Sequence, residues 1–169
     1  MAKTLEELKL GFARVEAAQA CRNLMGKYSY YHTAFRNQEY IDLWAKREDD
    51  LLVMPWGYYQ GIEGVRKCYL QDHGDRNDPE IQDSPILKGG MMMHCMDTEV
   101  LEVAGDGKTA KGLWYSIGQD TYPNGDGTAK ALWNTGKVAI DFVKEGDAWK
   151  IWHIVEANDL ATEGGTTYG

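Results

Sequence analysis

The sequence predicts a single α+β domain in which N-terminal helices pack on one side of a strongly curved antiparallel sheet. Apolar residues recur at three- and four-residue spacing through the first third of the chain, as in helices. From residue 91 onward they alternate with polar residues between glycine-rich turns, as in strands. The expected strands of about 11–14 residues exceed the usual roughly 3–10 residues, so they must bend. We therefore expect the sheet to curl around a pocket that the helices close.

Residues 4–36 are expected to form one long helix or two nearly collinear helices. Thr4 suits the N-cap, and Glu7 lies three positions on, as in a capping box. Helical spacing relates the apolar residues of this segment, which are Leu5, Leu8, Phe12, Val15, Leu24, Tyr28, Tyr31 and Phe35. A short second helix is expected over 37–46, with Asn37 as its cap.

After the second expected helix, the pattern of apolar residues changes. Residues 49–61 hold a short apolar run that ends at Pro55 and Gly57, which predicts a strand followed by a turn. Residues 61–74 are expected to form a third helix with Gly74 as its C-cap. Residues 75–90 contain two prolines and no periodicity, so we expect a loop, which either acts as a lid or merely connects two elements.

Four strands are expected to follow, over 91–104, 109–122, 128–144 and 149–157. Gly-Asp-Gly at 105–107 and glycine-rich turns further on predict hairpins between them. We expect the domain to span residues 1–160 and residues 161–169 to form a flexible C-terminal tail.

Composition excludes several classes of partner. The net charge is −8 and no Lys/Arg cluster is present, which disfavours nucleic acid and anionic membrane surfaces. No apolar run approaches the roughly 18 residues of a membrane span. The first 18 residues carry charges throughout and resemble no secretory signal, so we expect a cytoplasmic protein.

The cysteines predict neither a disulfide framework nor a zinc site. Cys21, Cys68 and Cys95 are odd in number and widely spaced, with no C-x-x-C pair. Ten Tyr and six Trp accompany only three Phe. Because these side chains join a large apolar body to a polar handle, they suit pockets for ring-shaped ligands as well as cores.

The alternation of side chains along the expected strands indicates which candidate catalytic residues share a face. One face of the strand over 91–104 carries Met92, His94 and Met96, and one face of the strand over 109–122 carries Trp114, Ser116, Gly118 and Asp120. If both faces line the concave side of the sheet, His94 and Asp120 form a His/carboxylate pair in the pocket. Such a pair is a common general acid/base device. The alternative is that His94 is a core histidine with an ordinary hydrogen-bond partner.

A tyrosine on the first helix is the third candidate. Tyr28 and Tyr31 lie about one helical turn apart on the expected inward face, where a phenol could donate to a developing oxyanion. Core packing is the alternative for both. We expect His32, His73 and His153 to be structural or solvent-exposed.

Three segments together resemble the nuclear-transport-factor-2-like superfamily, in its polyketide-cyclase-like (SnoaL-like) branch. They are "LMGKYSYYHTAFRNQEYIDLWAKREDDLLVMPWGYYQGIEGVRKCY", "MMMHCMDTEVLEVAGDGKTAKGLWYSIGQD" and "GKVAIDFVKEGDAWKIWHI", which cover most of the chain. The resemblance implies a cone-shaped fold with a deep apolar pocket and acid/base chemistry without a metal or organic cofactor.

The resemblance also implies roles for particular residues. His94 matches the pocket histidine of the dehydratases, Asp120 the acid/base position in the next strand, and either Tyr28 or Tyr31 the helix-one tyrosine. The Tyr-Asp pair of scytalone dehydratases would fall at Phe35 and Arg36, so scytalone itself is not the expected substrate. The residues expected to contact substrate are Trp56, Trp114, Phe35, Met92 and Met96.

We therefore expect a cofactor-independent lyase, acting on a hydroxylated aromatic or polycyclic small molecule. Dehydration is the first expectation, and deformylation by C–C cleavage is a variant of it. An isomerase, a cyclase and a non-catalytic small-molecule-binding protein are the alternatives. The apolar stripe from Leu5 to Val15 suggests a homodimer or homotrimer.

Overall fold

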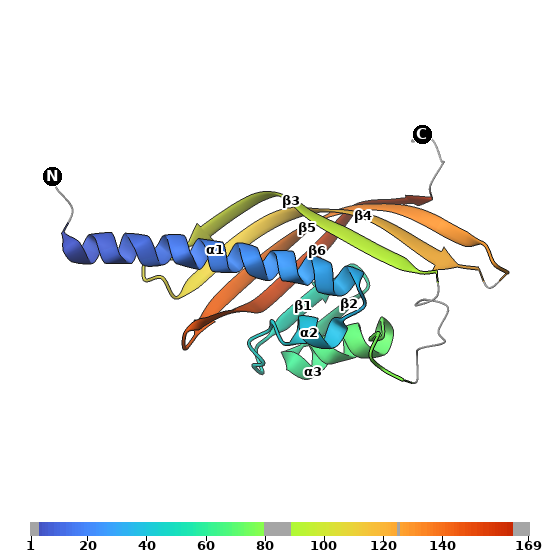
Figure 1. The fold of residues 1–169 in the computed structure, drawn as a ribbon, viewed down its shortest axis with the longest axis horizontal. Helices are drawn as coiled ribbons and strands as arrows, with labels where there is room; N and C mark the ends of the chain where they lie inside the picture. The colour runs from blue at the N-terminus through green and yellow to red at the C-terminus, as the bar shows by residue number, and fades with distance from the viewer. Residues whose placement is uncertain (1–3, 80–88, 125, 164–169) are drawn as a thin grey trace.

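The computed structural model describes residues 4–79, 89–124 and 126–163, and it shows a long helix laid across a curved six-stranded sheet (Figure 1). The helices are α1 (Leu5–Thr33), α2 (Asn37–Ile41) and α3 (Gly61–Arg66), the last continued by a π-helical segment, η1 (Lys67–Asp72). The strands are β1 (Leu51–Met54), β2 (Gly57–Gln60), β3 (Met91–Val103), β4 (Thr109–Pro123), β5 (Ala129–Glu145) and β6 (Ala148–Glu163). The predicted α+β class is confirmed.

The sheet has the strand order β2-β1-β6-β5-β4-β3. Strands β3 to β6 form the expected antiparallel meander. The expectation of a wholly antiparallel sheet is wrong at one place, because β1 pairs with β6 in parallel, with Leu52 opposite Ile154. No hairpin joins these two strands, and the long intervening chain permits the parallel direction.

The sheet is strongly curved, as its strand lengths predict. Strands β4, β5 and β6 have 15, 17 and 16 residues, which is longer than common strands. The pairing register shifts between Asp97 and Val100 on β3, and again twice between β5 and β6. Such bulges bend a strand and increase its twist. The concave face packs against the helices, and its core includes Leu52, Ile140, Ile151 and Ile154 from the sheet and Met25, Tyr40, Trp44 and Tyr69 from the helical segments.

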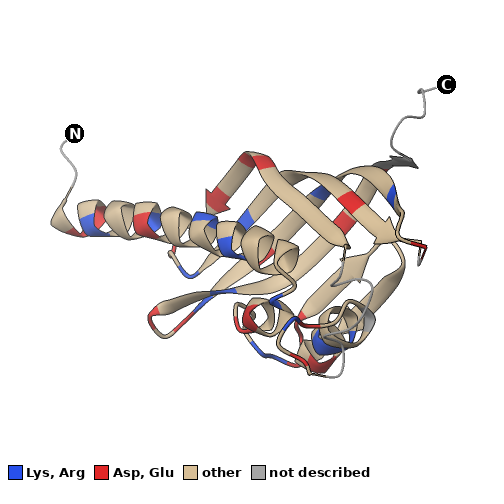
Figure 2. Cartoon of the chain, turned by 45° about the vertical axis from the view of Figure 1, so that its right-hand side comes forward, with Lys and Arg blue, Asp and Glu red and all other residues tan. Residues whose placement is uncertain are grey.

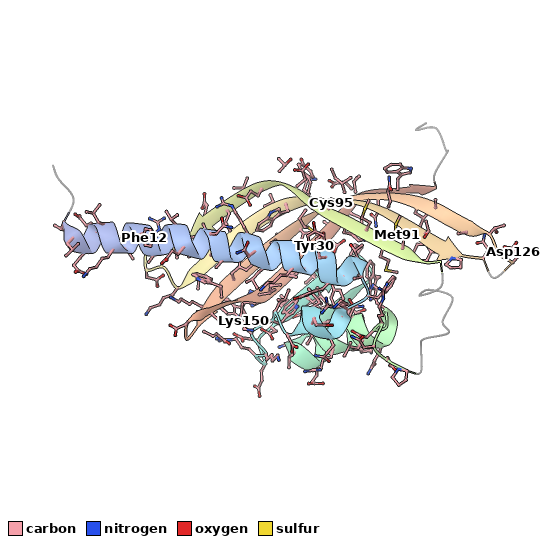
Figure 3. All side chains as sticks on the ribbon, viewed as in Figure 1. Phe12, Tyr30, Met91, Cys95, Asp126 and Lys150 are labelled. Carbon is pink, nitrogen blue, oxygen red and sulfur yellow. The ribbon has the colours of Figure 1, made fainter. Side chains whose placement is uncertain are left out.

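Helix α1 is one continuous helix that begins at the predicted cap. The Thr4 side chain accepts from the Glu7 backbone, and the Glu7 carboxylate accepts from the Thr4 backbone. The C-terminal half of α1 buries its apolar residues, whereas Leu5, Leu8, Phe12 and Val15 remain exposed. The first turns of α1 extend past the sheet, and Phe12 lies on this half of the helix (Figures 1 and 3).

Helix α2 is shorter than predicted and is capped differently. Arg36 holds the N-cap position, and the buried Asn37 instead donates from its amide to the Gly74 carbonyl oxygen at 2.6 Å. The helix ends at Ile41 because the following backbone pairs with β6, where Ala45 donates to the Ile151 carbonyl. The turn predicted near Pro55 is present, but it leads into β2, which the sequence did not predict.

Helix α3 and η1 occupy the range predicted for the third helix, and Gly74 follows with a φ of +84°, as a C-terminal glycine should.

Of the predicted loop over 75–90, the first residues are fixed to the α1–α2 junction. Asp75 accepts from the Gln38 backbone and Arg76 donates to the Phe35 carbonyl, both at 2.7 Å. Residues 80–88, which hold most of the predicted loop, lie outside the described residues. Strand β6 runs past residue 160, where the sequence predicted the domain to end. Residues 164–169 also lie outside the described residues.

Helix α1 covers the free edge of the sheet, where β3 is the last strand. Ser29 donates from its hydroxyl to the His94 carbonyl at 2.6 Å, and Arg14 donates to the Val103 carbonyl at 2.9 Å. These bonds occupy edge groups that would otherwise be free to pair with another strand. Acidic and basic residues are interspersed along the helix (Figure 2). No helix among the described residues has both the length and the apolar character needed to cross a membrane.

Candidate active site

His94 and Asp120 lie side by side beneath the C-terminal half of α1. His94 on β3 is paired with Gly118 on β4, and Asp120 lies two positions along β4 on the same face. The His94 Nε2 atom is 3.5 Å from Asp120 Oδ1, and the His94 Nδ1 atom is 3.1 Å from Ser116 Oγ. The imidazole therefore spans from Ser116 to Asp120, and the structure brings together the pair that strand phase predicts.

Gly118 makes room for this arrangement. A Cβ atom at this position would lie 2.9 Å from His94 Nδ1 and 2.9 Å from the Met93 carbonyl oxygen. The alternation Ser-x-Gly-x-Asp on one face of β4 thus supplies two polar neighbours for the ring and a gap between them. The alternation of side chains along the strands predicted the shared face, but not that position 118 must lack a side chain.

The contact between His94 and Asp120 leaves a carboxylate oxygen available to a third hydrogen-bonding group. Its length of 3.5 Å exceeds that of an ordinary N–H···O hydrogen bond. Asp120 Oδ1 is buried and has no hydrogen-bond partner among the described residues. Because a buried acceptor without a donor is costly, this oxygen favours a proton on His94 or a donor group of a ligand.

The surroundings make His94 a stronger proton acceptor than free imidazole. Burial lowers the pKa of His94, but its contact with Asp120 and the negative charge of that carboxylate outweigh the effect and raise the pKa above the ordinary 6.5. Because Ser116 engages Nδ1, the nitrogen that exchanges a proton with a ligand is Nε2.

A cavity of about 60 Å³ adjoins the pair. Ligand pockets commonly have roughly 300–1,000 Å³, so this cavity is small, with room for about two water molecules. Its lining is more polar than the methionine-rich strand suggested, and it consists of Tyr28, His32, Met54, Trp56, His73, Met92, His94, Asp120, Tyr122, Asn134 and Glu156.

Glu156 is a site residue that sequence reasoning missed. It lies on β6, is only 9% exposed, and shares the cavity with His94 and Asp120. Burial raises the pKa of Glu156, the nearby His94 lowers it and Asp120 raises it further, with a net increase above the ordinary 4.5. The pattern that could have found it is its alternation with the buried Ile154, two residues earlier on the same strand.

His32 and His73, which we expected to be structural or solvent-exposed, also line the cavity. His32 follows Tyr28 by four residues and stacks on its ring, so helical spacing could have placed it on the same face. Burial and the neighbouring His73 and His94 lower the pKa of His32 to about 3, which keeps it neutral. His73 has its Nδ1 atom 2.7 Å from the Cys68 carbonyl. His153 lies outside the cavity and contacts Asp141 at 3.0 Å, as a structural residue.

Of the two candidate tyrosines, the structure places only Tyr28 at the cavity. Burial raises the pKa of the Tyr28 hydroxyl, so it remains a neutral phenol. Tyr31 is partly buried against the hydrophobic core, and the Arg36 guanidinium lies 5.1 Å above its ring.

The residues expected to contact substrate divide into two groups. Trp56 and Met92 line the cavity. Trp114 and Met96 instead line a separate groove of about 560 Å³ between α1 and β3, and Phe35 is buried where α1 ends, with a φ of +53°. The larger groove has no His/carboxylate pair along it; its charged residues are Arg22 and Glu99, which form an ion pair with each other.

Within the described residues, no three His, Cys, Asp or Glu side chains are grouped so that they could hold a metal ion. The side chains at the cavity can instead exchange protons. His94 with Asp120 supplies an acceptor, and Glu156, Tyr28 and Tyr122 supply acidic groups nearby.

Comparison with known sequences decides the family, because the SnoaL-like domain pattern matches residues 13–155. The chain belongs to the SnoaL-like domain family. No curated protein matches the sequence closely enough to be counted as a relative.

The solved structures agree with this SnoaL-like fold. A provisionally named scytalone dehydratase from Novosphingobium aromaticivorans is 14% identical, with a TM-score of 0.69 and 93% of each chain covered. A hexachlorocyclohexane dehydrochlorinase, LinA-type3, from Novosphingobium barchaimii is 12% identical, with a TM-score of 0.67, covering 94% of this chain and 98% of the other. An NTF2-like protein from Novosphingobium aromaticivorans is 14% identical, with a TM-score of 0.69, covering 98% of this chain and 94% of the other. At these identities the similarity shows the fold.

Proposed function

We propose that this SnoaL-like protein is a lyase that eliminates water from a hydroxylated small molecule by acid/base catalysis. The observation that carries the proposal is the pairing of His94 with Asp120 at a buried cavity, with the nitrogen Nε2 facing a carboxylate oxygen that has no hydrogen-bond partner among the described residues. His94 takes a proton from a carbon atom of the substrate. Asp120 stabilises the resulting imidazolium.

The electrostatics support proton abstraction as the work of His94. A raised His94 pKa increases the driving force for proton transfer to Nε2, and general base catalysis contributes roughly 10²–10⁴-fold. The Ser116 contact at Nδ1 and the gap above Gly118 fix the ring orientation, so Nε2 is already positioned when a ligand arrives.

Elimination is favoured over other acid/base reactions because two of the similar structures carry names of eliminating enzymes, a dehydratase and a dehydrochlorinase. Tyr28 is available to donate a hydrogen bond to an oxygen of the substrate. Met54, Met92 and Trp56 provide the apolar part of the wall, which suits an aromatic ring. The volume of about 60 Å³ requires the cavity to widen before it admits a polycyclic molecule.

The proposal is tested by incubating the protein with a panel of hydroxylated aromatic and alicyclic compounds and following loss of one water by mass spectrometry. We expect His94→Gln to lower the rate by roughly 10²-fold or more. The matched control is His153→Gln, which removes a histidine that also contacts a carboxylate but lies outside the cavity. That control should keep the wild-type rate.

Other outcomes contradict the proposal in distinct ways. A rearranged product of unchanged mass would identify an isomerase or cyclase. A compound that binds at the cavity and is recovered unchanged would identify a binding protein. Equal loss of activity in both histidine variants would show that His94 is a structural residue.

A further inference from the structure

Glu156 is a carboxyl group at the cavity that the proposed chemistry has not used. It projects from β6, which β5 and β4 separate from β3 in the sheet, yet it shares the cavity with His94. No side chain of the described residues forms a hydrogen bond with its carboxyl group. A buried carboxyl without such partners is costly to ionise.

The groups that surround Glu156 reinforce the same protonation state. The ionisable neighbours at the cavity or in electrostatic contact with Glu156 are Tyr28 and His32 from α1, Tyr69 and His73 from the η1 region, His94 from β3, and Asp120 and Tyr122 from β4. His32 is held neutral, and the phenols are neutral at ordinary pH. Asp120 is the other carboxyl group at the cavity, and His94 Nε2 lies 3.5 Å from its Oδ1 atom.

We propose that Glu156 is the general acid of this site and that the substrate is an uncharged alcohol. This inference rests on the elimination proposed above. His94 lies beside a carboxylate and accepts protons readily, whereas burial and the neighbouring Asp120 favour the protonated form of Glu156. The reverse assignment would require two carboxylates to be ionised together in a buried cavity.

The elimination then balances without any other reactant. Nε2 of His94 takes a proton from a carbon, and the electrons of that C–H bond form the second bond of a new C=C. The C–O bond on the neighbouring carbon breaks, and the leaving oxygen takes the proton of Glu156 and departs as water. Glu156 is left as a carboxylate and His94 as an imidazolium. A proton passes back from His94 to Glu156 through a water molecule, for which a cavity of about 60 Å³ has room.

The charge of the lining selects the substrate. None of the described residues that line the cavity is Lys or Arg. A substrate carboxylate would meet Asp120 and find only His94 as a cation, and that histidine must be neutral to act as the base. An uncharged molecule with hydroxyl groups can instead donate hydrogen bonds to Asp120 and to neutral imidazole nitrogens.

The test compares Glu156→Gln, Glu156→Asp and His94→Gln, with Glu102→Gln as a matched control because Glu102 is exposed on β3. For an alcohol substrate, we expect Glu156→Gln to lower kcat by roughly 10²–10⁴-fold with little change in KM, and to remove the basic limb of the pH profile. Glu156→Asp should recover part of the rate. Infrared spectra near neutral pH should show a protonated carboxyl band in the wild type that Glu156→Gln lacks.

A change of leaving group separates catalysis from a structural role. A substrate that releases a nitrophenolate needs no proton from an acid, so Glu156→Gln should process it at close to the wild-type rate, whereas His94→Gln should not. If Glu156→Gln retains the wild-type rate and pH profile on the alcohol while His94→Gln does not, the acid assignment fails and the proposed elimination stands. If neither variant loses activity, both fail. Faster turnover of a carboxylate substrate than of its amide would overturn the assigned substrate charge.

Discussion

Gly118 shows how a single residue sets the geometry of this site. Its missing side chain leaves the space that the His94 ring occupies, and its neighbours Ser116 and Asp120 approach the two ring nitrogens from either side. The identities of His94 and Asp120 alone would not orient the ring. The residue opposite it decides whether Nε2 can face the carboxylate.

Gly118→Ala should therefore displace the His94 ring and lower the rate of elimination. The added Cβ would meet both the ring and a backbone oxygen, so an overpacking cost of roughly 1–3 kcal/mol in unfolding free energy is also expected. Chemical denaturation and the elimination assay measure the two effects. Gly105→Ala is the matched control, since a Cβ there meets nothing within 4 Å. Unchanged activity in Gly118→Ala would show that ring orientation does not matter.

At the scale of elements, α1 and β3 hold the site together. The helix runs along the free edge of β3, and its side chains donate to strand carbonyls at two places, Ser29 to His94 and Arg14 to Val103. The first bond lies at His94, the proposed base, and the second lies well away from it. These contacts thus shield the edge of the sheet from pairing with another strand, and they position His94.

Ser29→Ala should lower the unfolding free energy by about 1 kcal/mol and also reduce activity, because the bond it removes fixes the backbone of His94. Arg14→Ala removes the same kind of bond far from the cavity and should lower stability by a similar or smaller amount while activity remains. Thermal denaturation and the elimination assay measure both effects. Equal activity in the two variants would contradict a positioning role for Ser29.

The sequence predicted the elements that have strong periodicity and missed those set by contacts distant in the chain. Helix α1 and strands β3 to β6 follow from their apolar spacing. The early end of α2 depends on pairing between Ala45 and Ile151, and the parallel β1–β6 pair depends on where β1 enters the sheet. The same limit applies to the site. The alternation of side chains along the strands predicted that His94 and Asp120 lie together, but Glu156 and His32 reach the cavity only through the curvature of the whole sheet and the position of α1.

At the scale of the whole molecule, two apolar surfaces are left uncovered within the chain. One is the α1 stripe already noted, where Leu5, Phe12 and Val15 are each about two-thirds exposed. The other is the outer face of the sheet, with Val100, Leu113, Tyr115, Ile117, Trp133 and Val155. Contiguous exposed apolar surface usually marks an interface. We propose that further copies of the chain cover it, in a homodimer or homotrimer.

Phe12→Ser should shift the wild-type oligomer toward monomer in sedimentation or light-scattering measurements at micromolar concentration. Ile117→Ser makes the same kind of change on the sheet face, so the pair of variants identifies which surface is used. A wild-type protein that is monomeric under these conditions would contradict the proposed self-association.

The charge relation between His94 and Asp120 is central to the proposed chemistry, and it can be measured without a substrate. The measurement is an NMR titration of the His94 ring in the wild type and in Asp120→Asn. Because the carboxylate stabilises the imidazolium, we expect a His94 pKa above 6.5 in the wild type and a clear decrease in the variant. The stability that His94 contributes should accordingly be present below pH 6.5 and be lost as the pH rises through its folded-state pKa. A wild-type pKa at or below 6.5 that the Asp120→Asn change leaves in place would contradict the assignment of this pair as the acid/base centre.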